Sequence, residues 1–139
     1  MQFVSWLERY YFEKYILDVS IATLERGGVT SKLDTYQFLD PIDAWGFPKY
    51  PSRTRVLDPR ANLAQAIARF IQENDAYLRE ADAWLGTWVN PNTRNCHIDV
   101  TTISLGLEEA RQEAIKRGQM ASRAILALYH FKSNQTIFL

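Results

Sequence analysis

The hydrophobic pattern of the chain opens with a helical period. Over residues 2–26, apolar side chains recur at steps of three and four residues, which is the spacing of one helix face, and Lys14 is the one break. This stripe consists of Phe3, Leu7, Tyr10, Leu17, Ile21 and Leu24. Gly27 and Gly28 follow it and supply a C-terminal stop. The pattern therefore predicts one long N-terminal helix.

This predicted helix carries more aromatic residues than one narrow stripe can hold. They are Phe3, Trp6, Tyr10, Tyr11, Phe12 and Tyr15. Either the helix is covered on more than one side by its own domain, or part of its aromatic surface meets a partner. Both interpretations remain open. The residues expected to form such a binding seam are Trp6, Tyr10, Tyr11 and Tyr15.

Residues 29–53 are predicted to be a long ordered loop, since prolines interrupt them and aromatic residues make them too apolar for a flexible linker. The segment from Trp45 to Arg53 joins stacking surfaces to two cations. It is either a loop that its aromatics hold against the domain or a groove for a ligand or peptide. The expected binding residues are Trp45, Phe47, Lys49, Tyr50 and Arg53.

The rest of the chain, residues 54–139, alternates strand and helix patterns and is expected to form the core. Strands are predicted over 54–57, 84–89, 96–101, 123–131 and 136–139, and helices over 60–79 and 105–117. Asp58 and Ser104 are the expected N-caps, and Gly118 the expected stop of the second helix. This order predicts a single α+β domain with an antiparallel or mixed sheet of four or five strands, two packed helices and the long N-terminal helix.

The run after Arg123 is the most apolar of the predicted strands. Both of its faces are apolar, which is typical of a central strand that is covered on both sides. We expect the helices at 60–79 and 105–117 to cover one face of the sheet. The N-terminal helix, or a second copy of the chain, would cover the other face.

The predicted hairpin over 84–101 holds the candidate chemistry. Alternation places Cys96, Ile98 and Val100 on one face and His97, Asp99 and Thr101 on the other. Cys96 is therefore on the wrong side to act as a nucleophile with His97. His97 and Asp99 are the catalytic candidates, although they need a nucleophile or metal that the sequence does not name, and Trp88 is a binding candidate. Gly86 leaves room for a close approach.

Composition narrows the classes of function. The 139 residues are the usual size of one domain, and 16 basic residues balance 16 acidic ones, so long-range attraction to nucleic acid or to an anionic membrane is absent. One cysteine excludes an intramolecular disulfide and predicts a reducing, cytoplasmic setting. No apolar run reaches the roughly 18 residues of a membrane span, and the N-terminal stretch does not read as a signal peptide.

Motifs for metal, nucleotide or nucleophilic chemistry are missing from the sequence, which has no CxxC, HExxH, GxGxxG, P-loop or GxSxG pattern. No cofactor or metal is expected, and a site made from His97, Asp99 and His130 would need adjacent strands in matching register. The nearest approach to a nucleic-acid surface combines cations with aromatic rings. It consists of Trp45, Lys49, Tyr50, Arg53, Arg55 and Arg60.

The runs Leu85–Pro91, Ile98–Thr102 and Leu107–Ala110 resemble a pattern in small uncharacterised accessory domains of bacteria, phages and plasmids. In that pattern a Gly-x-Trp-x-(Asp/Asn)-Pro turn precedes a strand with an Asp-(Val/Ile)-(Ser/Thr) element, a helix and a further strand. The resemblance covers roughly the last 60 residues. It implies a compact accessory domain and no particular activity.

The leading expectation is a non-catalytic interaction module that binds a protein partner, or itself, through the N-terminal helix or the Trp45–Tyr50 segment. The alternative is an enzyme or small-ligand binder with a pocket between that segment and the His97/Asp99 face. Nucleic-acid binding comes third. A cavity lined by Trp88, His97, Asp99 and Arg53 would favour the alternative, whereas an exposed aromatic patch on the first helix would favour a partner.

Overall fold

The computed structural model describes residues 5–139, so Phe3 of the predicted stripe lies outside the described residues. Within them the chain forms three α-helices, seven strands and one short 3-10 helix. The helices are α1 (Trp6–Arg26), α2 (Leu63–Leu78), α3 (Leu107–Met120) and η1 (Pro51–Arg53). The strands are β1 (Gly28–Ser31), β2 (Trp45–Pro48), β3 (Arg55–Leu57), β4 (Trp84–Val89), β5 (Cys96–Ser104), β6 (Ala127–His130) and β7 (Thr136–Phe138).

All strand pairs are antiparallel, and the order across the sheet is β1-β4-β5-β2-β6-β7. The nine-residue strand β5 is the centre of this sheet. One of its edges pairs with β4, and its other edge pairs with β3 near Cys96 and with β2 near Ser104. The fold is therefore α+β, as the sequence predicts.

The sheet has more strands than the four or five expected, because the predicted loop over 29–53 contributes two of them. Strand β1 pairs with β4, and β2 lies between β5 and β6. Each has only four residues, and β2 ends in Pro48, so neither shows a readable alternation. Trp45 and Phe47 belong to the sheet and not to a loop.

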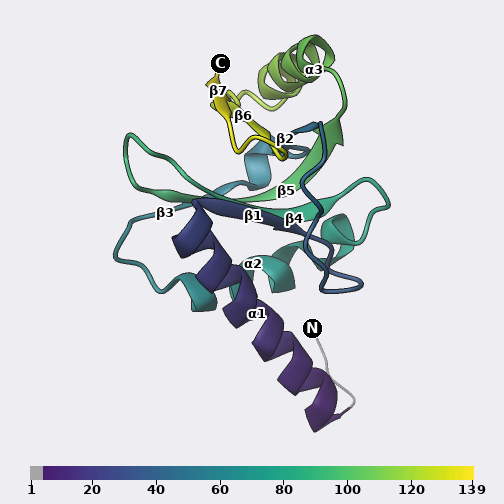
Figure 1. The fold of residues 1–139 in the computed structure, drawn as a ribbon, viewed down its shortest axis with the longest axis vertical. Helices are drawn as coiled ribbons and strands as arrows, with labels where there is room; N and C mark the ends of the chain where they lie inside the picture. Colours follow the sequence, from purple (N-terminus) through teal and green to yellow (C-terminus); the bar gives the residue numbers. More distant parts are fainter. Residues whose placement is uncertain (1–4) are drawn as a thin grey trace.

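One face of the sheet carries all three helices. Ile98 and Val100 of β5 pack with buried residues of α1 and α2. Paired residues of antiparallel strands point to the same side of the sheet, and Phe47 pairs with Thr102. The face that holds Ile98 and Val100 therefore continues into β2. There Trp45 and Phe47 pack with Ala110 and Ala114 of α3. Figure 1 shows the two helix groups below and above a curved sheet, with β2, β6 and β7 turned upwards.

The expectation that the N-terminal helix covers the opposite face is wrong, since α1 shares a face with α2. The opposite, concave face bears His97, Asp99 and Thr101, and the turned-up strands β2 and β6 close over it. At two glycines on this face, the missing side chain lets another part of the chain come close. A Cβ on Gly86 would lie 1.9 Å from the Thr101 hydroxyl, and one on Gly46 would lie 2.4 Å from the Phe131 ring.

The predicted central strand over 123–131 is also wrong. Only Ala127–His130 is extended, and this strand lies between β2 and the edge strand β7. Its apolar residues have two different neighbours: Ile125 and Leu128 pack with the α3 cluster, and the same stretch lines the concave face. This segment is apolar on both sides because one side packs against α3 and the other lines the cavity.

Helix ends follow local chemistry, with three corrections. Ser5 caps α1 and Gly27 ends it with a left-handed φ of 84°. Asn62, not Asp58, caps α2, and the helix is interrupted at Asn74, which has a non-helical φ of −123°. Ser104 belongs to β5 and α3 starts after Gly106; it then runs through Gly118 to Met120. A Cβ on Gly118 would approach the backbone of Ala124 to 3.2 Å.

We predict that Gly86→Ala destabilises the fold by about 1–3 kcal/mol, because its Cβ would overlap the buried Thr101 side chain. Urea denaturation measures this loss. Adding Thr101→Ala to Gly86→Ala should recover part of it, since the second substitution removes the overlapping hydroxyl. Equal stability of Gly86→Ala and the wild type would show that the sheet relaxes freely at this point.

Candidate functional site

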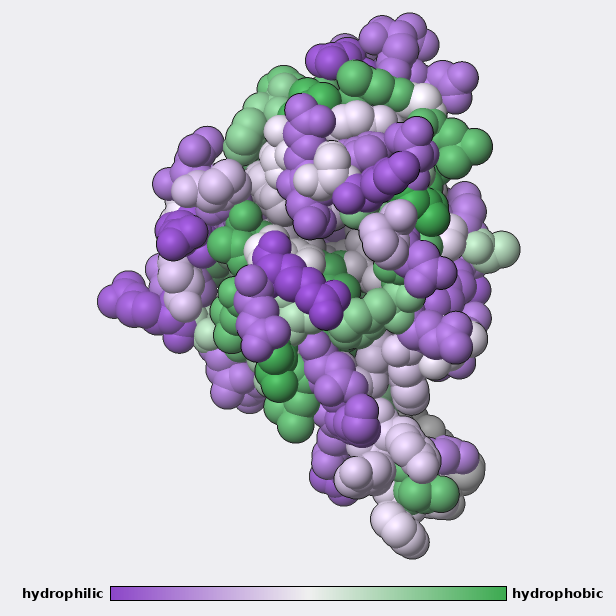
Figure 2. All heavy atoms as spheres, viewed as in Figure 1, coloured by the Kyte–Doolittle hydropathy of each residue, from purple (hydrophilic) through white to green (hydrophobic). Residues whose placement is uncertain are grey.

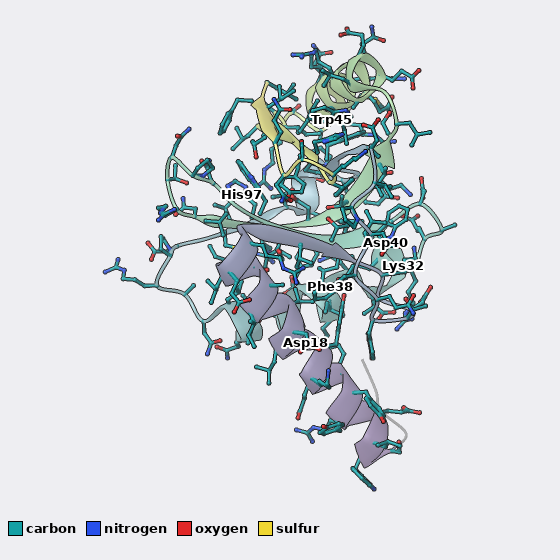
Figure 3. The ribbon with its side chains drawn as sticks, in the orientation of Figure 1. Asp18, Lys32, Phe38, Asp40, Trp45 and His97 are labelled. Atoms are coloured by element: carbon teal, nitrogen blue, oxygen red, sulfur yellow. The ribbon has the colours of Figure 1, made fainter. Side chains whose placement is uncertain are left out.

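The concave face of the sheet bears a half-open cavity of about 200 Å³. Its floor comes from β3, β4 and β5, and its far wall from the segment 123–131. His97 lies on the side of the sheet away from α1 (Figure 3). The walls are mostly apolar and include Ile125 and Phe131. The arrangement is that of a small-molecule site, in which apolar walls surround a few polar groups.

The polar floor is a row of side chains that alternation places together. His97, Asp99 and Thr101 face the cavity, whereas Ile98 and Val100 lie in the core on the other side, as predicted. On the neighbouring strand Trp88 pairs with His97, and their ring centroids are 5.1 Å apart. Gly86 pairs with Asp99, so no side chain of β4 crowds the carboxyl group.

Asp99 is held in place from the other edge of β5, where β3 pairs with it. The Thr54 hydroxyl, just before β3, donates a hydrogen bond to Asp99 Oδ1. Burial raises the pKa of Asp99 to about 6, against the opposing effects of the Thr54 hydrogen bond and the Arg123 charge. Arg123 also donates to the Thr54 carbonyl at 3.0 Å, so it lies at the rim of the cavity.

His97 is 8% exposed, and its burial, together with Arg123, lowers its pKa below the ordinary value. The ring is therefore neutral at pH 7. Neither nitrogen of the His97 ring has a hydrogen-bond partner among residues 5–139. Asp99 Oδ2 and the Thr101 hydroxyl also lack partners there. No fully enclosed side-chain nitrogen or oxygen among these residues lacks a partner, so these atoms remain accessible to solvent. Three neighbouring polar groups are thus free to contact a ligand.

Cys96 takes no part in this site. Its side chain is buried and its thiol lies near its own strand's backbone, 3.9 Å from the His97 carbonyl. Burial raises the pKa of the thiol to about 11, which keeps it protonated. The prediction that Cys96 and His97 do not form a nucleophilic pair agrees with this placement.

The predicted binding residues of the segment 45–53 are engaged inside the protein. Trp45 and Phe47 are buried. Lys49 binds Glu80 at 3.1 Å and Asp82 at 2.6 Å, and the Tyr50 hydroxyl donates to Glu80 at 2.7 Å. These contacts fasten the segment to the chain after α2.

Arg53 is occupied in the same way and does not line the cavity. Its guanidinium donates to Asn74 and to the Tyr77 hydroxyl, both at 2.9 Å, and lies 3.9 Å from the Tyr77 ring centre. Arg123 takes the place that the sequence assigned to Arg53. Two further cations of the suggested nucleic-acid surface, Arg55 and Arg60, each lie beside a carboxylate.

The predicted seam residues of α1 divide into two groups. Tyr15 is buried, and its hydroxyl forms a 2.6 Å hydrogen bond with Ser31, so it belongs to the core; burial raises its pKa to about 12. Trp6, Tyr10 and Tyr11 are exposed. The first turns of α1 project from the body of the protein (Figure 1), and this projecting end shows pale and green surfaces beside purple ones in Figure 2.

The apolar stripe read from the sequence proves to be the outer side of α1. Its members Leu7, Tyr10, Leu17, Ile21 and Leu24 are all exposed, with Leu24 at 74%. The core-facing residues form a second apolar face. They are Phe12, Tyr15, Ile16, Val19 and Ala22. The helix is therefore apolar on two sides, and the domain covers only one of them.

A second polar cluster surrounds His130 and was not anticipated. His130 Nε2 lies 2.8 Å from Asp43 and Nδ1 lies 2.7 Å from the Ser133 hydroxyl. This connectivity is that of a Ser-His-Asp triad. Ser133 and Asp43 are exposed, however. The Ser133 N–H donates to His130, so this N–H is not available to stabilise an oxyanion. The contacts are those of a turn that the His130 side chain stabilises.

Within residues 5–139, no group of three or more His, Cys, Asp or Glu side chains is placed to hold a metal ion. No helix of this part of the chain has the length and apolar character needed to cross a membrane. Comparisons with family models, with curated proteins and with solved structures found no significant match.

We predict that Asp99→Asn changes how stability depends on pH. The folded pKa of about 6 exceeds the ordinary 3.8, so this group stabilises the fold below about pH 4 and loses that contribution as the pH rises through 6. The free energy of unfolding of Asp99→Asn, relative to wild type, should increase by at most about 3 kcal/mol between pH 4 and 7. Urea denaturation at several pH values tests this; a constant difference would mean that Asp99 titrates normally.

Proposed function

We propose that this protein is a non-catalytic interaction module that pairs with another helix along the outer stripe of α1. The observation that carries this proposal is the exposure of Leu7, Tyr10, Leu17, Ile21 and Leu24 on one line of a 21-residue helix. Contiguous exposed apolar surface of this kind favours an interface. Trp6 and Tyr11 flank the line and add aromatic contact surface.

The spacing of the stripe favours a helical partner. Leu7, Tyr10, Lys14, Leu17, Ile21 and Leu24 follow steps of three, four, three, four and three residues. These are the a and d positions of a heptad repeat, whose side chains pack between those of a facing helix. At about 1.5 Å per residue the stripe is roughly 26 Å long.

Lys14 indicates which pairing suits a second copy of the chain. In a parallel pair the two Lys14 ammonium groups would occupy the same layer and repel each other. In an antiparallel pair Lys14 lies opposite Leu17, Tyr10 opposite Ile21 and Leu7 opposite Leu24. Lys14 already binds Asp18 at 2.9 Å on the helix surface, so a nearby carboxylate would remain within its reach. We therefore propose an antiparallel homodimer.

The folded domain lowers the cost of this association. A short isolated helix is marginal in water, because ordering its backbone costs entropy. The inner face of α1 packs on the sheet and α2, and Ser5 and Gly27 cap its ends. The helix is thus formed before a partner arrives, which favours binding.

We predict that Leu17→Glu with Ile21→Glu makes the protein monomeric. Each carboxylate would be buried without a partner in the paired helices, which costs several kcal/mol. Light scattering over a dilution series should show a dimer for the wild type and a monomer for the variant, with unchanged circular dichroism. Arg9→Glu is the matched control, since it makes the same change in net charge away from the stripe. A monomeric wild type at every concentration would contradict self-association.

Lys14→Leu should act in the opposite direction. It fills the one polar position of the stripe and gives up only an exposed ion pair, which contributes little. The dimer should therefore persist at lower concentration than in the wild type. Arg9→Leu adds the same apolar side chain off the stripe and should leave the dissociation constant unchanged. If both variants associate equally, the gain is non-specific.

A further inference from the structure

We infer that the cavity on the concave face binds a small planar nitrogen heterocycle that presents two adjacent N–H donors to Asp99. The cavity lies on the face of the sheet opposite to α1, so this site does not depend on the proposed pairing of helices. Three features support this inference: the free polar atoms of the floor, the size of the space and the balance of charge.

The free atoms define what the ligand must offer. Thr54 occupies one of the two lone pairs of Asp99 Oδ1, and Oδ2 has no partner in the described part of the chain, so both oxygens can still accept a hydrogen bond. A purely structural role for Asp99 explains the first oxygen and not the second. His97 is nine-tenths buried and lines the cavity, and both of its ring nitrogens are unpartnered there. A carboxylate accepts hydrogen bonds only, so its ligand must donate.

Two further polar groups lie within a short distance along β5. Successive residues on one face of a strand are roughly 7 Å apart, so His97 and Thr101 flank Asp99 on either side. The Thr101 hydroxyl can donate or accept, and neutral His97 offers one donor and one acceptor. A ring whose donors meet Asp99 can therefore place an adjoining carbonyl against His97 or Thr101.

Size and wall chemistry restrict the ligand to about one or two rings. A buried cavity of about 150 Å³ accommodates benzene, and this one measures about 200 Å³. Phe131 and Ile125 supply apolar walls, and Trp88 lies across from His97. Flat apolar surfaces of this kind suit an aromatic heterocycle, which buries its faces and hydrogen-bonds through its edge.

Charge favours a neutral ligand over a cation. Arg123 lies at the rim and acts electrostatically on both Asp99 and His97. The ionised Asp99 is thus already balanced, and a cationic ligand would add an uncompensated positive charge. The class that fits is a neutral heterocycle with a guanine-like edge, in which an amino group adjoins a ring N–H and a carbonyl.

Isocytosine and uracil form a matched pair of probes. They have the same ring size, but isocytosine presents an amino group next to a ring N–H, whereas neither ring N–H of uracil has a second donor beside it. Calorimetric titration or ligand-observed NMR at millimolar ligand should show isocytosine binding at least about tenfold more tightly, because uracil can give Asp99 only one N–H donor at a time. Equal binding, tighter binding of uracil or no binding of isocytosine would overturn the proposal.

Asp99→Asn tests the contact itself. The amide has the same shape but replaces one acceptor oxygen by a donor, so isocytosine affinity should fall at least about tenfold. Asp58→Asn is the control, since it makes the same change on the exposed surface. Unchanged affinity in a folded Asp99→Asn protein would overturn the assignment. If that variant does not fold, the comparison of the two probes on the wild type decides the question.

The pH dependence of isocytosine binding supplies an independent readout. The titratable or charged groups facing Asp99 from the cavity are His97 on the same strand, Arg123 on the far wall and Tyr129 on β6. Tyr129, whose pKa burial raises, keeps its proton below pH 8, and the lowered pKa of His97 keeps it neutral near pH 7. Affinity should fall about tenfold per pH unit below the pKa of Asp99. A flat profile between pH 5 and 7.5 would contradict binding to the carboxylate.

Discussion

The close approach of chain segments at two glycines sets the shape of this protein. At Gly86 the space of a side chain is taken by Thr101, and at Gly46 it is taken by Phe131. Both contacts lie on the concave face, where the half of the sheet containing β2 and β6 turns back over β5. A side chain at Gly86 would displace Thr101, and one at Gly46 would displace the Phe131 ring, and both of these residues line the cavity. The lining of the cavity therefore depends on these two contacts.

The sequence was sufficient for the features that depend on local order. Two-residue alternation in β5 separated His97, Asp99 and Thr101 from Ile98 and Val100, and the structure has the same division. The α+β class and the end of α1 at Gly27 followed from equally local signals. Strands β1 and β2 were not predicted, because each is too short to show a hydrophobic period. Their pairing also depends on partners more than fifty residues away in the sequence.

The site was only partly predictable for a related reason. The sequence predicted Asp99, His97 and Trp88 as site residues, with Arg53 as their cationic neighbour. In the structure Arg123 occupies that position, and Arg53 binds Asn74 and Tyr77 instead. Nothing in the sequence places Thr54 or Arg123 beside Asp99, since these contacts arise from strand pairing and sheet curvature. Likewise, periodicity found an apolar stripe on α1 but not which side faces the core, because the helix is apolar on both sides.

The pairing of early strands with late ones has a consequence for synthesis of the chain. β1 joins β4 and β2 joins β5, so the first strands have no partner in the sheet until residues 84–104 have been made. Until then α1 has no completed sheet against its inner face, although α2 has already been made. Contacts this distant in sequence close slowly, since long loops must be ordered first. A growing chain of this protein therefore exposes more of the apolar surface of α1 than the folded domain does.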